Sequence, residues 1–329
     1  SMDYYIDGLA TAKPTLNLQE GGTYIFDESD SSNNSHLFAF STTADGTFGG
    51  GTEYTTGVTH TGTPGQAGAK TTIIVAAGAP DLSYYCVYHG GMGGGANTVV
   101  GGSSNFQGTI PSIISANTAA GFSIVRYTGI NANATIGHGL AKAPEFIITK
   151  NLGSAQWECY YKDSYTGADS VIFFDQTGAG ESAGSSYWND THPTASVFSV
   201  GNGGPGGQTS PYLAYCFHSV DGYSRYGQYR GNGNSNGPFI TTGFRPAFVM
   251  IKHYDGGDSW PIADNRRGYN GQIARLRANT SGLEDDAGRI SFHANGFKID
   301  VSYAETNQNN SDYMYLAFAE SPFKTATAR

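Results

Sequence analysis

The chain repeats itself at a distance of about 102 residues, and this duplication limits its architecture more than any other feature. The apolar run at 146–150 (FIITK) returns at 248–252 (FVMIK), and 212–217 (YLAYCF) returns at 313–318 (YMYLAF). A repeat of this length is the size of a small domain and is too long for one turn of a solenoid. We therefore predict two copies of one domain, at 121–222 and 223–329.

Each copy is predicted to be an antiparallel β-sandwich. Short runs of β-branched and aromatic residues alternate with Asn-Gly and Gly-Gly turns, as in chains of strands and hairpins. The 47 glycines and the 13% aromatic residues fit strands joined by turns. No long segment has helical periodicity, and a single short helix is expected at 272–279.

The first part of the chain, at residues 3–94, is predicted to be a further β-sandwich. Its alternating or apolar runs, bounded by Gly-rich turns, predict strands at 15–18, 23–26, 36–40, 71–75 and 84–86. The Gly- and Ser-rich segment 95–120 has the composition of a flexible linker. The sequence therefore predicts an all-β protein of three sandwiches with a linker after the first.

Four side chains in this first part have the character of metal ligands. Cys86, His89 and Met92 are spaced by three residues, and His36 lies fifty residues upstream. A thiolate, two imidazoles and a weak thioether are the ligands of a mononuclear blue-copper site. Zinc could occupy the same site as a substitute, whereas the soft Met favours Cu(I). We therefore predict a copper site.

Residues 84–93 (YYCVYHGGMG) resemble the C-terminal ligand loop of the cupredoxins, the plastocyanin and amicyanin class. The resemblance implies a Greek-key β-sandwich over residues 3–94, with copper bound by the matching positions His36, Cys86, His89 and Met92. Better-known cupredoxins carry Asn directly after the first His, where this chain has Leu37. Candidates to support the ligand loops in its place are Asn33, Asn34 and Ser41.

The duplicated region resembles a domain of unknown function in tail and fibre proteins of marine bacteriophages. The similar segments are 139–151, 187–189, 196–201, 242–252 and 317–324. The resemblance implies a virion protein, made in the host cytoplasm and exposed on the particle. Its expected partners are other virion proteins and a host-cell receptor or glycan. Fibre proteins are often trimers, so a homotrimer is expected by analogy.

Charge, hydropathy and cysteine content limit the possible partners, membrane insertion and disulfides of the chain. The net charge of −9 and the lack of a basic run argue against nucleic acid as a partner. No apolar stretch reaches 18 residues, so no membrane insertion by a helix is expected. For Cys159 and Cys216, a disulfide and two buried thiols remain alternatives.

We expect no enzymatic activity. The chain lacks the His-Glu-x-x-His motif, and its Gly-rich loop at 201–207 lacks the Lys-Ser/Thr ending of a phosphate loop. The leading hypothesis is a phage tail or fibre protein for host attachment that carries a type 1-like copper site. The alternatives are a soluble blue-copper electron-transfer protein with adhesion modules, and a glycan-binding or glycan-degrading tail protein.

Overall fold

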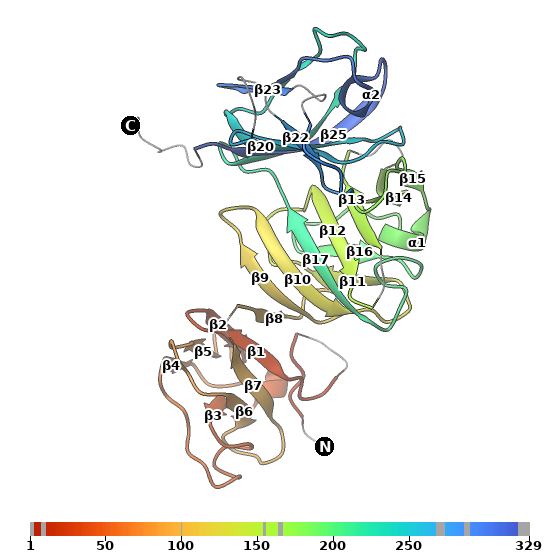
Figure 1. The fold of residues 1–329 in the computed structure, drawn as a ribbon. Helices are drawn as coiled ribbons and strands as arrows, with labels where there is room; N and C mark the ends of the chain where they lie inside the picture. Colours follow the sequence, from red (N-terminus) through yellow and green to blue (C-terminus); the bar gives the residue numbers. More distant parts are fainter. Residues whose placement is uncertain are drawn as a thin grey trace. The chain divides into compact units, whose positions relative to one another are not determined.

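The computed structural model describes residues 3–7, 11–99, 101–153, 156–163, 167–267, 274–285 and 290–321. About 42% of the structure is strand and about 5% is helix, which confirms the all-β prediction. The chain divides into two compact units, Ser1–Ser115 and Ala116–Arg329, whose strands can be followed in Figure 1. Among the described residues, no helix has the length and apolar character needed to span a bilayer.

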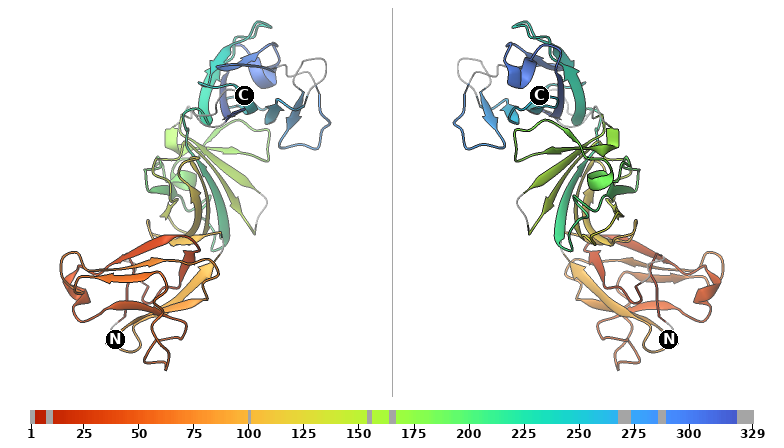
Figure 2. Two further views of the ribbon diagram at one scale, coloured as in Figure 1. Left: turned by 90° about the vertical axis from the view of Figure 1, so that its left-hand side faces the viewer. Right: turned by 90° about the vertical axis from the view of Figure 1, so that its right-hand side faces the viewer.

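The first unit contains two sheets, whose strands can be followed from two sides in Figure 2. One sheet has the order β1-β7-β6-β3, with strands Leu16–Gln19, Gly94–Val99, Leu82–Cys86 and Phe38–Ser41. The other has the order β2-β5-β4, with strands Thr23–Asp27, Lys70–Ile74 and Val58–Thr61. Strands β1 and β7 are parallel, whereas the other pairs are antiparallel.

The two sheets of the first unit share one hydrophobic core. Alternate residues of β1, Leu16 and Leu18, point into it and are at most 2% exposed. Phe40 of β3 and Ile73 of β5 belong to the same cluster although they lie in different sheets. Because both sheets bury one face against this cluster, the unit is a β-sandwich.

The segment expected to be a linker, 95–120, contains strands. It includes most of β7, which pairs with both β1 and β6 and so completes the sandwich of the first unit. It also includes β8 (Ser103–Asn105) and most of the antiparallel partner strand β9 (Ser112–Asn117). Gly-rich composition alone did not distinguish a flexible linker from β-strands. Glycine also occurs in strands that pack against large side chains, as at Gly94, the first residue of β7, which lies beside the Tyr84 ring.

In the second unit the larger sheets of the two copies share a run of five equivalent strands in the same order. Copy 1 runs β14-β13-β12-β17-β10, with strands Ser170–Phe173, Trp157–Tyr161, Phe146–Asn151, Pro211–Phe217 and Phe122–Thr128. Copy 2 runs β22-β21-β20-β25-β18, with strands Arg275–Arg277, Pro261–Asp264, Pro246–His253, Asp312–Ala319 and Ser224–Arg230.

Smaller elements complete each copy. In copy 1 they are β11 (Ala134–Gly137) paired with β16 (Val197–Val200), the edge strand β15 (Glu181–Ser182) and the helix α1 (Ser185–Trp188). In copy 2 they are the sheet of β19 (Phe239–Thr241), β24 (Gly296–Ile299) and β23 (Ile290–His293), and the helix α2 (Ala304–Asn307).

The copies also share a detail of packing. Tyr127 lies opposite Tyr212 in copy 1, and Tyr229 lies opposite Tyr313 in copy 2. The ring centroids are 5.3 Å apart in the first pair and 4.9 Å in the second, with nearly parallel planes in both. The sequence repeat therefore reflects a repeated structure.

The two copies are joined by a common core. Val249 and Ile251 of β20 face the inner core of copy 2, whereas Met250 between them packs with Phe146 and Tyr161 of copy 1. The central sheet of copy 2 is thus buried on both faces. This explains why its central strand reads as a nearly continuous apolar run, and why both copies belong to one compact unit.

The short helix expected at 272–279 is not formed where the structure describes this range. Arg275–Arg277 is strand β22, and residues 272 and 273 lie outside the described residues. Arg275 and Arg277 both form ion pairs with Asp285 and Glu305, and Arg275 is 1% exposed. Alternate residues of a strand share a face, which lets both guanidinium groups reach the same two carboxylates.

All three cysteines are free and buried. Cys216 lies opposite Ile147 and Cys159 lies opposite Ile148, on strands that flank β12 from its two sides. Two strand spacings, about 9.6 Å, exceed the reach of a disulfide. Of the two alternatives for these residues, the structure has the two buried thiols.

Candidate metal centre

Two chain segments bring the predicted ligands of the first unit together. Cys86 is the last residue of β6 and lies opposite Phe38, the first residue of β3. His36 comes two residues before that strand, and the Val87 amide donates to the Leu37 carbonyl at 3.0 Å. The antiparallel register therefore places the His36 segment beside the start of the loop that carries His89.

The ligand atoms of His36, Cys86 and His89 all lie within 4.8 Å of one another. The Cys86 sulfur is 3.6 Å from Nδ1 of His36 and 3.7 Å from Nδ1 of His89. A metal with bonds of about 2.3 Å to sulfur and 2.0 Å to nitrogen, at tetrahedral to trigonal angles, gives sulfur–nitrogen separations of about 3.5 to 3.8 Å. The three side chains therefore fit a single small metal ion.

Burial differs among the four predicted ligands. Cys86 is fully buried and Met92 is 4% exposed, and both belong to the hydrophobic core of the first unit. His36 and His89 are half-buried. Desolvation, and next the neighbouring His89, hold the pKa of His36 below its usual value, which favours the neutral ring that a metal needs.

The loop after Cys86 is held by contacts that the sequence did not indicate. Asp45 accepts the Gly91 amide hydrogen at 2.7 Å, and the Lys13 ammonium donates to the Gly91 carbonyl at 2.6 Å. The Tyr4 amide donates to the Met92 carbonyl at 3.1 Å. These partners lie far away in sequence, so no local spacing could have revealed them.

Tyr4 also lies at the ligands themselves. Its hydroxyl donates to the His36 carbonyl at 3.2 Å. Burial, and next the Cys86 thiol, raise the pKa of the Tyr4 phenol. The neutral hydroxyl therefore lies close to both the Cys86 side chain and the backbone of His36.

Among the described residues, none of Asn33, Asn34 and Ser41 has a side-chain hydrogen bond to a predicted ligand. Ser41 donates instead to the Thr52 carbonyl, and Asn33 meets His36 only through its backbone. The side chains that hold this part of β3 are Glu28 and Thr71. Glu28 accepts the Phe38 amide hydrogen at 2.7 Å, and the Thr71 hydroxyl lies 2.8 Å from the Phe38 carbonyl.

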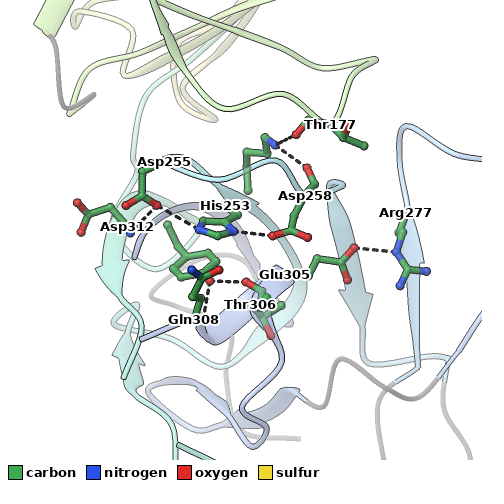
Figure 3. A network of polar contacts seen from close by, with 12 residues as sticks. Thr177, His253, Asp255, Asp258, Arg277, Glu305, Thr306, Gln308 and Asp312 are labelled. Carbon is green, nitrogen blue, oxygen red and sulfur yellow. Dashed lines mark hydrogen bonds and ion pairs between the residues drawn. The ribbon is translucent and has the colours of Figure 1, made fainter. Parts of the chain in front are cut away.

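A second polar cluster lies in copy 2 of the second unit (Figure 3). The ring of His253 lies between two carboxylates, with Nδ1 2.6 Å from Asp258 and Nε2 3.1 Å from Asp255. Because its nitrogens face opposite carboxylates, the ring separates these oxygens instead of converging with them on one point. Within the described ranges, His36, Cys86 and His89 form the one group of three His, Cys, Asp or Glu residues whose ligand atoms converge.

The fold and the site define an all-β protein with a candidate cysteine–histidine metal centre in its first sandwich. The sequence model of a family described as a domain of unknown function, DUF7483, matches residues 95–322, more than half of the chain. The chain therefore belongs to this family. No curated protein and no solved structure matches it. The candidate metal centre lies outside the matched residues.

Proposed function

We propose that the first unit binds one copper ion through the sulfur of Cys86 and the imidazoles of His36 and His89, with Met92 as a weak axial ligand. The observation that carries this proposal is the convergence of three ligand atoms within 4.8 Å from two chain segments. A buried thiolate and two neutral imidazoles would hold copper in a dry site, where it could carry one electron or stabilise the fold. Zinc fits the same three donors and is the competing ion.

Metal analysis with a visible spectrum tests this proposal. We expect one copper per chain and an intense thiolate-to-copper absorption band, both lost in Cys86→Ser. Cys216→Ser is the matched control, since this buried thiol lies in the other unit and should leave the spectrum unchanged. A colourless protein that holds one zinc would identify the competing ion, and no bound metal would overturn the proposal.

We propose further that the whole chain is a virion component of the tail or fibre type, with the duplicated sandwiches acting in host attachment. This role is supported by the sequence resemblance of the duplicated region and by its glycine- and aromatic-rich strands. Binding to bacterial cells without turnover of their polysaccharide is the expected result. Turnover would favour the glycan-degrading alternative, and reversible electron transfer would favour the soluble cupredoxin.

A cavity of about 310 Å³ in the second unit favours a glycan as the attachment ligand. Its lining combines tyrosine rings, such as Tyr161 and Tyr254, with the planar polar groups of Asp163, Gln228 and Asp312. Such groups match the hydroxyl-rich faces and apolar C–H faces of a sugar. We expect Gln228→Ala to weaken cell binding without unfolding the chain, because this side chain is exposed.

A further inference from the structure

A chain of hydrogen bonds crosses the first sandwich and ends beside the metal centre. It begins at the half-buried Glu53, whose Oε1 lies 2.9 Å from Nε2 of His60. Nδ1 of His60 lies 2.8 Å from the hydroxyl of Thr71, and this hydroxyl lies 2.8 Å from Oε2 of Glu28. The inner half of the chain is dry, since Thr71 is fully buried and Glu28 is 3% exposed.

This chain of bonds ends on the backbone of Phe38. Strand β3 lies at the edge of its sheet, so the Phe38 amide and carbonyl that face away from β6 need other partners. Glu28 accepts from the amide and Thr71 reaches the carbonyl. Phe38 in turn lies directly opposite Cys86 and two residues after His36.

The single proton of the Thr71 hydroxyl allows two arrangements. When Glu28 is ionised, the hydroxyl donates to its carboxylate and leaves the Phe38 carbonyl without that donor. When Glu28 is protonated, its carboxyl donates to Thr71, and the hydroxyl can donate to Phe38 instead. Burial raises the pKa of Glu28, and the charged or titratable groups that act on it are Asp27, His60 and Tyr4.

We propose that Glu28 and Thr71 are positioning residues of the metal centre, which hold the His36 end of β3 against Cys86 and connect it through His60 to the solvent. This inference rests on the proposed copper function. It assigns the support that a neighbouring Asn would otherwise supply to Thr71 of strand β5 and to Glu28, the residue directly after strand β2. Groups that orient metal ligands in this way typically change metal affinity 10- to 100-fold when they are removed.

Three substitutions test the inference. Thr71→Val removes the hydroxyl with little change of volume, Thr71→Ser restores it, and Thr72→Val alters the opposite face of the same strand. We expect Thr71→Val to lower copper affinity about 10- to 100-fold and to shift the charge-transfer band. Thr71→Ser should return both values to within about twofold of the parent, and Thr72→Val should leave them unchanged.

The role of Glu28 is read from pH dependence. We expect the charge-transfer band of the parent protein to shift with pH as the two hydrogen-bond arrangements exchange. Glu28→Gln cannot ionise, so the shift attributable to this group should disappear. If Thr71→Val kept both the band position and the copper affinity of the parent protein, the inference would be overturned. The proposed copper function would still stand in that case.

If the protein binds no copper, the proposed function is overturned. The positioning role can then still be tested in the metal-free chain. In the metal-free chain, hydrogen exchange at the Phe38 amide and the ring shifts of His36 report the position of β3. Thr71→Val should speed the exchange and move the ring shifts, and Thr71→Ser should not. Equal exchange rates and equal ring shifts in all three proteins would count against the positioning role.

Discussion

Asn151 and His253 occupy the same place in the two copies, because each ends the central strand and lies opposite a stacked tyrosine. In copy 1 the Asn151 amide donates to the Tyr212 hydroxyl at 3.0 Å. In copy 2 the His253 ring stacks on Tyr313 with a centroid distance of 4.7 Å. The fold therefore accepts an asparagine side chain at this position. The histidine of copy 2 differs in that it also contacts the carboxylates of Asp255 and Asp258.

Replacement of this histidine by its counterpart, His253→Asn, should destabilise the second unit by about 1–3 kcal/mol, because Asp258 loses a close partner. Urea unfolding at neutral pH measures the loss. Asp258→Asn combined with His253→Asn should cost less than the sum of the two single changes. Strict additivity would mean that the 2.6 Å contact contributes nothing.

Glu158 should make the stability of the second unit depend on pH. Burial raises its pKa from 4.5 to about 7. Between these values the folded chain binds more protons than the unfolded chain, so stability falls as the pH rises. Glu158→Gln should remove this dependence and stabilise the unit above pH 7 by up to about 3 kcal/mol. Thermal unfolding at pH 5 and pH 8 checks it, with the exposed Glu284→Gln as the control.

If the proposed copper site is correct, copper should stabilise the first unit, because the ligands converge in the folded chain and have no comparable arrangement in the unfolded chain. At a free concentration of about 1,000 times the dissociation constant, the expected gain is about 4 kcal/mol. Calorimetry should show the transition of the first unit rising with copper and returning with a chelator. The transition of the second unit should stay in place, and Cys86→Ser should abolish the response.

Gly93→Ala should disrupt the ligand loop. A methyl group at this position would lie 1.8 Å from the Tyr84 carbonyl oxygen, so the backbone after Met92 must move. We expect a loss of about 3 kcal/mol together with weaker copper binding. Gly95→Ala is the matched control, because its nearest contact is an ordinary 3.4 Å to Thr15. Equal stability of the two variants would contradict the close approach.

The sequence was sufficient for much of this structure. Segments such as 146–150 and 248–252 predicted equivalent strands, and both are central in sheets of the same strand order. The spacing of Cys86 and His89, with His36 upstream, predicted a convergence that the register of β3 and β6 produces. Local patterns succeeded here because strand period and ligand spacing are properties of short segments.

Other features depend on contacts between distant segments. Nothing next to His36 in sequence indicates Glu28 or Thr71, since folding brings strand β5 and the residue after strand β2 to the backbone of Phe38. The short helix at 272–279 failed because ion pairs of Arg275 and Arg277 with distant carboxylates favour a strand. The common core of the two copies was missed because an apolar run does not reveal what covers its second face.

The sheet of copy 2 that is covered on both sides decides how this chain can be divided. A fragment that began at residue 223 would present Met250, Leu316 and their neighbours to water, and it should aggregate. A cut near residue 115 divides strand β9, but it leaves this shared core intact. The smallest part of the duplicated region that can be expressed or transferred alone is therefore the pair of copies together.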